Sequence, residues 1–198
     1  EDADTVSRYD GISLNIIAEK IDEGWLPKMA ELLIKALDQL GSSDWAKEAR
    51  FEIAGILKII AARIAPEMLS PITEAFVSVL SQAVLDAAAH YLTKRTANAL
   101  EEVVKKVRPA ELPALLQPVL LAASQIQGYE DDAVQAEASL VKVLDTIVER
   151  TGDDELLANF HSLASVHLDA NYVTDSTLRL KAARKLKIYV GQVLKKIA

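Results

Sequence analysis

Apolar side chains recur along this chain at helical spacing, three or four residues apart, and short polar or proline-containing segments interrupt them. Leu33, Leu37 and Leu40 mark one face of a first segment, which begins at Leu26-Pro27 and is followed by Gly41 and two serines. Proline is tolerated in the first turn of a helix, and glycine commonly follows the last turn. The pattern therefore predicts a helix, a short turn and a second helix.

The same reading extends along the chain as pairs of helices, an A helix followed by a B helix. Asp44 is expected to cap the first B helix, whose inner face carries Ile53, Ile56, Leu57, Ile60 and Ile64 and which ends near Pro66. In the second pair, residues 87–91 contain no breaker, and the two helices are expected to meet nearer Lys94. The expected A helices cover residues 26–40, 68–85, 109–127 and 153–169, and the expected B helices cover 44–65, a segment ending at 108, 131–150 and 176–197.

This pattern returns about every 43 positions, four times over. Leu57 thereby corresponds to Leu100 in the second unit and to Leu144 in the third, and Arg63 corresponds to Arg150. A helical hairpin cannot bury its apolar face alone, so units of this size stack on one another. We expect Leu57, Leu100 and Leu144 to occupy equivalent buried positions on successive B helices.

A fragment of the same pattern precedes the first full unit. Subtraction of one period from Leu57, Ile60 and Ile64 gives Leu14, Ile17 and Ile21, which are also apolar and helically spaced. We expect these three side chains to pack on the first unit as a half-repeat. This helix is either a terminal cap or the edge of a longer array, and both interpretations stay open. Residues 1–11 are read as a flexible leader.

The period and the turn residues resemble the HEAT and armadillo repeats. Asp44, with Arg50 six residues later, is similar to the turn Asp and B-helix Arg that form a ladder between HEAT neighbours. The resemblance implies an all-α fold: a right-handed α-solenoid of about four two-helix repeats plus an N-terminal half-repeat helix. Residues 12–198 then form one domain, with units at about 26–66, 67–109, 110–152 and 153–198.

Composition agrees with a folded, well-cored protein, because 51% of the residues are hydrophobic and 26% are charged. The chain has no Cys, which excludes disulfides, a thiol nucleophile and thiolate metal sites. The most apolar stretch, residues 53–64, contains Lys58 and Arg63 and is shorter than the roughly 20 residues that span a bilayer. With no secretory signal in residues 1–10, we expect an intracellular, cytoplasmic protein.

Charge is distributed unevenly. The total is −7, which argues against general nucleic-acid binding. Residues 174–198 hold seven Lys and Arg against one Asp, a net of +6 that leaves −13 for the remainder. The last predicted helix directs Lys181, Arg184, Lys185 and Lys196 outward. These four residues are either a solvated face or the candidate binding site for an acidic protein or peptide partner.

Residue types that carry catalytic or metal chemistry do not form a specific motif. His90, His161 and His167 lack the spacing of a zinc site and are interpreted as structural. The acidic runs 130–132 and 153–155 stand at predicted helix starts, where they cap helices. Trp25, Trp45, Tyr91, Tyr129 and Tyr172 lie near helix ends, either as core plugs, which we prefer, or as binding anchors. No catalytic residue and no cofactor is expected.

The sequence favours a non-catalytic protein-interaction scaffold, because stacked repeats form an extended concave face that holds elongated partners. Two alternatives stay open. The chain can be an artificial or purely structural repeat without a natural partner. It can also be a helical bundle that binds a ligand or acts as an enzyme, in which case a pocket lined by His90 or His161 is expected.

Overall fold

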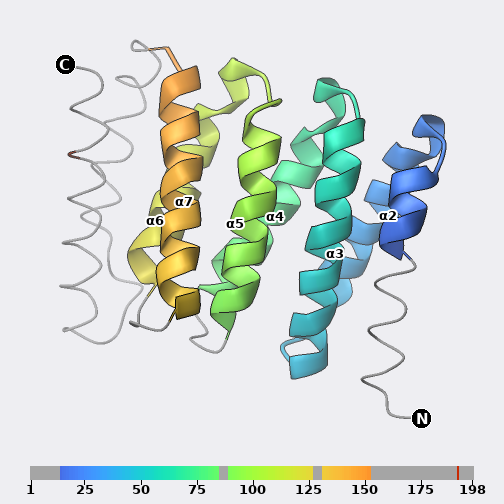
Figure 1. Cartoon of the computed structure of the whole chain (residues 1–198), viewed down its shortest axis with the longest axis horizontal. Helices are drawn as coiled ribbons and strands as arrows, with labels where there is room; N and C mark the ends of the chain where they lie inside the picture. The colour runs from blue at the N-terminus through green and yellow to red at the C-terminus, as the bar shows by residue number, and fades with distance from the viewer. Residues whose placement is uncertain (1–13, 85–88, 127–130, 153–190, 192–198) are drawn as a thin grey trace.

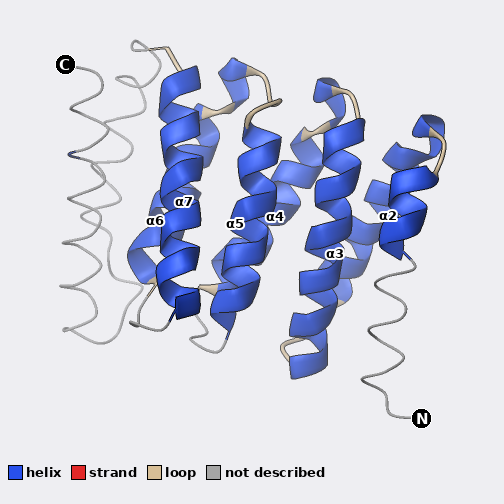
Figure 2. Cartoon of the chain, viewed as in Figure 1, coloured by secondary structure: helices blue, strands red, loops and turns tan. Residues whose placement is uncertain are grey.

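The computed structural model describes residues 14–84, 89–126 and 131–152 together with Gly191. All regular structure in these ranges is helical (Figure 2). Residues 14–20 are helical, and the longer helices are α2 (Leu26–Gln39), α3 (Asp44–Arg63), α4 (Ser70–Ala83), α5 (His90–Val104), α6 (Pro113–Gln125) and α7 (Asp131–Arg150). Single 3-10 turns are η1 (Glu23–Trp25), η2 (Pro66–Met68) and η4 (Pro109–Glu111).

Local chemistry explains where the helices begin. Pro27, Pro71 and Pro113 stand at the first or second position of α2, α4 and α6, where a missing N–H costs no hydrogen bond. Ser43 caps α3, because its hydroxyl accepts a hydrogen bond from the backbone N–H of Ala46 at 3.3 Å. The prediction that Asp44 is the cap was wrong by one residue, since Asp44 already lies in the first turn.

The helices form two layers (Figure 1). In one layer α3 packs against α5 and α5 packs against α7, and these helices run in the same direction. In the other layer α4 packs between α2 and α6. Within each hairpin the two layers meet through α2 with α3, α4 with α5, and α6 with α7. The A helices α2, α4 and α6 thus pack against one another in sequence order, and so do the B helices α3, α5 and α7.

The core lies between the two layers and is built mainly of Leu, Ile, Val and Ala. Leu57 and Leu100 are fully buried and Leu144 is 4% exposed, so the predicted burial of these three side chains is confirmed. Ile60, Val103 and Ile147, one turn later in α3, α5 and α7, are also fully buried. Residues at the same position of the period in α3, α5 and α7 are therefore buried to a similar extent.

Basic side chains at or just after the ends of α3, α5 and α7 connect neighbouring helices of the layer that contains these three helices. The guanidinium of Arg63 donates hydrogen bonds to the carbonyl oxygens of Ala18 at 2.7 Å and Ile21 at 2.8 Å, at the end of helix 14–20. Arg150 donates to the carbonyl oxygen of Val104, the last residue of α5. The final carbonyls of a helix have no partner within that helix, and positive charge is favourable there.

Lys106 makes the corresponding contact at the end of α3. Its Nζ donates to three backbone carbonyl oxygens, those of Ala61 at 2.8 Å and of Ala62 and Ile64 at 3.0 Å. We refer to Arg63, Lys106 and Arg150 as the end cations. Each caps the C-terminal end of the preceding helix in its layer.

The Asp–Arg ladder implied by the HEAT resemblance is not formed by Asp44 and Arg50. Arg50 is buried and donates to the carbonyl oxygen of Leu40 at 2.8 Å, which caps the end of α2 within the same hairpin. The Asp44 carboxylate pairs with Lys47 in its own helix at 3.1 Å. Connection between neighbouring hairpins is supplied by the end cations instead.

Both ends of α5 and of α4 were displaced from their predicted positions. α5 begins at His90, not near Lys94, and ends at Val104, four residues before the predicted end at Arg108. α4 covers Ser70–Ala83, two residues shorter than predicted at each end, and the 3-10 turn at residues 66–68 accounts for its later start. Pro109 disfavours helical geometry at the preceding residue, which accounts for the extended backbone of Arg108. The limits of α7 match the prediction.

Candidate functional site

Several residues singled out from the sequence lie outside the described ranges. These are the basic set Lys181, Arg184, Lys185 and Lys196, together with His161, His167, Tyr129, Tyr172 and the acidic run 153–155. The binding role of the basic set therefore stays a prediction.

Both tryptophans are on the surface. The side chain of Trp25 is 64% exposed at the end of η1, and that of Trp45 is 62% exposed in the first turn of α3. The preferred interpretation of them as core plugs was wrong, because both project from helix ends away from the two-layer core. Tyr91 is half-buried, with its ring 5.6 Å from that of Phe51.

The polar candidates within the described ranges have structural positions. Asp131 and Asp132 occupy the first turn of α7, where negative charge meets the positive end of the helix dipole. His90 is buried at the start of α5, and its Nδ1 has no hydrogen-bond partner. No group of three or more His, Asp or Glu in the described ranges could hold a metal ion.

Two surface hollows lie between hairpins, and His90 lines neither. One lies beside the turn between α2 and α3 and is lined in part by Lys47 and Arg50. The other lies between α2 and the start of α4, with Glu31 and Met68 in its lining. No helix of the described ranges is both long and apolar enough to cross a membrane.

Exposed apolar side chains gather at the N-terminal edge of the two layers. We call this surface the open edge and define it by side chains from helix 14–20, η1 and α2. Its members are Leu14 (38% exposed), Ile16 (47%), Ile17 (47%), Trp25 (64%) and Leu32 (57%). Large apolar surface of this kind marks interaction sites in soluble proteins.

Helix 14–20 was predicted to pack through Leu14, Ile17 and Ile21, and this was wrong for two of the three residues. Only Ile21 packs against the core, and the fully buried residue of this helix is Ala18. Leu14 and Ile17 stand one period before Leu57 and Ile60, which are fully buried. Among the described residues, no A helix covers Leu14 and Ile17 in the same way.

The outer face of α2 shows the same difference. Leu32 is largely exposed and Leu33 is half-buried, whereas Ala75 and Phe76, one period later in α4, are buried. α4 is flanked by α2 on one side and by α6 on the other. Among the described helices, α2 has a neighbour in this layer only on the side of α4. Large apolar side chains such as Leu32 therefore lie at the surface on its other flank.

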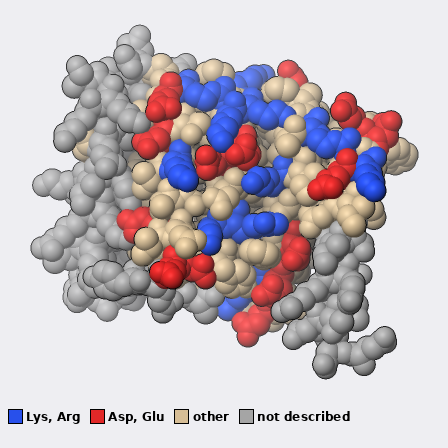
Figure 3. Space-filling model, in the orientation of Figure 1, with Lys and Arg blue, Asp and Glu red and all other residues tan. Residues whose placement is uncertain are grey.

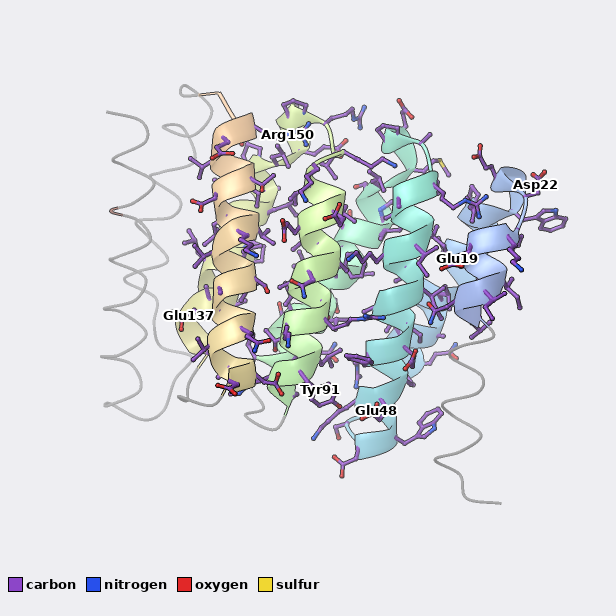
Figure 4. The ribbon with its side chains drawn as sticks, in the orientation of Figure 1. Glu19, Asp22, Glu48, Tyr91, Glu137 and Arg150 are labelled. Carbon is purple, nitrogen blue, oxygen red and sulfur yellow. The ribbon has the colours of Figure 1, made fainter. Side chains whose placement is uncertain are left out.

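Charged groups border the open edge. Glu31 on α2 forms salt bridges with Lys28 and Lys35. Hydrogen bonds from these two lysines lower the pKa of Glu31 to about 2, and the bond from Lys28 has the larger effect. Glu19 and Asp22 lie at the other border, near the end of helix 14–20 (Figure 4). Lys20 lies between them in sequence and is exposed.

A second feature lies where α3 and α5 meet. The guanidinium of Arg95 stacks 4.9 Å from the centroid of the Phe51 ring and lies against Gly55, whose missing side chain leaves room for it. Tyr91 and Glu48 lie near the same end of these helices (Figure 4). Burial, and then the Glu48 carboxylate, raise the pKa of the Tyr91 phenol. In this view basic and acidic side chains of the described residues lie interspersed (Figure 3).

The sequence interpretation missed the end cations and the exposed flank of α2. A signal for the former was present, because Lys20, Arg63 and Lys106 fall at the same phase of the period of about 43 residues. The repeat gave no signal for the exposure of Leu32, because Ala75, one period later, is buried. Comparison of the chain with models of protein families, with curated proteins and with solved structures gave no match in any of the three.

Proposed function

We propose that this protein is a non-catalytic protein-interaction scaffold built as a right-handed α-solenoid of HEAT- or armadillo-like two-helix repeats. Support for the architecture comes from the parallel order of α3, α5 and α7 and from the end cations, which recur once per hairpin. Buried side chains at the same phase of each B helix support it further. The resulting units are about 26–66, 67–109, 110–152 and 153–198.

The observation that carries the proposed function is the open edge. Leu14, Ile17 and Leu32 occupy phases that are buried in the following hairpin, yet each is 38% exposed or more. Covering them removes apolar surface from water, which favours association. Trp25, 64% exposed at the start of α2, belongs to a residue type that is enriched in binding hot spots. The partner we infer is a protein, and the open edge is its main contact.

The basic segment 174–198 is a second contact in this proposal. Its charge of +6 would attract an acidic partner at long range, and such attraction is screened as ionic strength rises. Replacement of Lys181, Arg184 and Lys185 by Glu should then slow association. The rate should also fall between low salt and about 1 M salt, where the Debye length is only about 3 Å. An association rate insensitive to both would remove this segment from the site.

The direct test is affinity capture from a cell extract with quantitative mass spectrometry. The wild-type chain is compared with Ile17→Asp/Leu32→Asp, and with Val134→Asp as the matched control, since Val134 is 53% exposed on α7. We expect one or a few proteins to be enriched by the wild type and the control and to be lost from the edge variant. Equal recovery with all three baits would contradict a role for the open edge. The absence of any enriched protein would favour a purely structural repeat.

A further inference from the structure

Lys20 occupies the phase of an end cation. It precedes Arg63 by one period, as Arg63 precedes Lys106, and it stands at the end of its helix as they do. The three end cations each donate to the last carbonyls of the preceding parallel helix. Lys20 is exposed, and no described helix on its outer side offers it such carbonyls. The open edge therefore contains a hydrogen-bond donor, Lys20 Nζ. The three end cations show the acceptors that a donor at this position uses, which are backbone carbonyl oxygens at the end of a neighbouring helix.

The apolar side chains of α2 at the open edge indicate where a further helix would pack. On the next hairpin, α4 packs on α2 and α5 packs on α3, and Ile72 and Phe76 of α4 are fully buried. Met29 and Leu33 occupy the corresponding phases on α2 and are only half-buried. An A-type helix would cover them, and a B-type helix would end at Lys20. The two requirements together describe a hairpin.

We propose that the open edge docks an amphipathic helical hairpin supplied by a partner polypeptide. Its first helix packs along α2 over Leu32 and Leu33, and its second runs parallel to helix 14–20 with its last-turn carbonyls accepting hydrogen bonds from Lys20 Nζ. This inference rests on the proposed function and names the chemistry of the partner. It continues the interface that already joins α2 and α3 to α4 and α5.

A second copy of this chain fits the open edge less well. Two-fold symmetry would place helix 14–20 of one copy against that of the other. The carbonyls of Ala18 and Ile21 at the end of that helix already accept hydrogen bonds from Arg63. If the two helices run parallel, Lys20 meets carbonyls that are already occupied, and if they run antiparallel, it meets the N-terminal end of the other helix, which has no free last-turn carbonyls. A hairpin with an uncapped C-terminal end has no such conflict.

The probe for the test is a synthetic peptide of residues 26–66, because this hairpin makes the corresponding interface within the chain. A fluorescent label allows its binding to the full-length protein to be followed by anisotropy. We expect saturable binding to the wild type, weakened at least about tenfold by Leu32→Asp and several-fold by Lys20→Met, which removes only the charged donor. Val134→Asp and Lys142→Glu on α7 are the matched controls and should change the affinity by less than about twofold.

The isolated hairpin is marginally stable as a free peptide, so a second measurement is needed. The same hairpin is joined ahead of residue 1 by a long Gly/Ser linker, which raises its effective concentration to the millimolar range. Hydrogen exchange of the α2 amides should slow in this fusion and return to the original rate when Leu32→Asp is added. If α2 exchange is unchanged in the fusion and the peptide does not bind, the proposal is wrong.

Two further outcomes separate this inference from its premise. Dimerisation of the chain alone that is abolished by Leu32→Asp in sedimentation equilibrium would identify a second copy as the occupant and overturn the hairpin. A captured partner that depends on Ile17 and Leu32 but is unaffected by Lys20→Met would overturn the hairpin geometry, while the scaffold function stands. If capture of the partner depends neither on Ile17 and Leu32 nor on Lys20, the proposed function is contradicted as well.

Discussion

Gly55 is a residue whose small size has a specific contact to explain it. It lies within α3, where glycine usually costs about 1 kcal/mol relative to alanine. A Cβ at this position would meet the guanidinium of Arg95, which stacks on Phe51. The helix propensity gained by Gly55→Ala is therefore opposed by displacement of Arg95.

We expect Gly55→Ala to change the free energy of unfolding little in the wild-type chain and to stabilise it by about 1 kcal/mol in an Arg95→Ala background. Urea denaturation of the four chains of this double-mutant cycle measures the difference. A full gain in the wild-type background would show that Arg95 moves away without cost.

Glu31 provides a residue-scale prediction for acid pH. The ammonium groups of Lys28 and Lys35 lie 2.8 and 2.7 Å from its two carboxylate oxygens and lower its pKa from 4.5 to about 2. Because the pKa is lower in the folded than in the unfolded state, this carboxylate contributes to stability above about pH 4.5. The contribution is lost as the pH falls towards 2.

An NMR titration of the Glu31 carboxyl carbon should give a midpoint near 2 in the wild type and a higher one in Lys28→Met. Exposed ion pairs are strongly screened by solvent, so a wild-type midpoint near the ordinary value of 4.5 would show that the bridge does not persist in solution.

At the scale of elements, the end cations connect the ends of neighbouring helices through hydrogen bonds to backbone carbonyls. Lys106 satisfies the carbonyls of Ala61, Ala62 and Ile64, which otherwise lack partners in α3. Its neighbour Lys105 instead pairs with Glu102 at 2.8 Å on an exposed surface. The two adjacent lysines therefore form a matched pair, one connecting two helices and one confined to its own.

Lys106→Met should reduce the free energy of unfolding by about 1.5–3 kcal/mol, the usual loss for hydrogen bonds from a charged donor. Lys105→Met should cost no more than about 1 kcal/mol. Chemical denaturation measures both, and hydrogen exchange at the end of α3 should accelerate only in Lys106→Met. Equal effects of the two substitutions would show that the carbonyl contacts add nothing beyond a surface charge.

For the whole molecule, stability depends on how each layer ends. Ala18 is fully buried and the carbonyls of Ala18 and Ile21 hold Arg63, so helix 14–20 protects the flank of α3 even though Leu14 and Ile17 face solvent. Removal of helix 14–20 would expose the flank of α3 to solvent and leave the Arg63 guanidinium without its two hydrogen-bond acceptors.

Deletion of residues 1–24 should therefore lower the melting temperature and promote aggregation. Size-exclusion chromatography with light scattering and thermal unfolding measure these effects. The control is Leu14→Ser/Ile17→Ser, which should leave the fold intact because both side chains are already exposed. A deletion variant that stays monomeric with an unchanged melting temperature would show that helix 14–20 is not part of the cooperative unit.

The sequence alone determined the helical class, the position of most helices and much of the core. Leu57, Leu100 and Leu144 could be predicted as buried because helical periodicity and the period of about 43 residues are local and additive signals. The limits of α7 followed from the acidic residues at its start and from Gly152 after its end. Shifts of two to four residues elsewhere arose where 3-10 turns compete with helix ends.

Tertiary structure decided which apolar and basic residues have neighbours. Leu32 and Ala75 occupy the same position in the period, yet only Ala75 lies on a helix with described neighbours on both sides, so Leu32 is at the surface and Ala75 is in the core. Likewise Lys20 and Lys106 share a phase, and only Lys106 meets the end of a preceding helix. Burial and capping are relations between segments far apart in the chain. They depend on the position of a helix in the array, which a repeating pattern of residues does not encode.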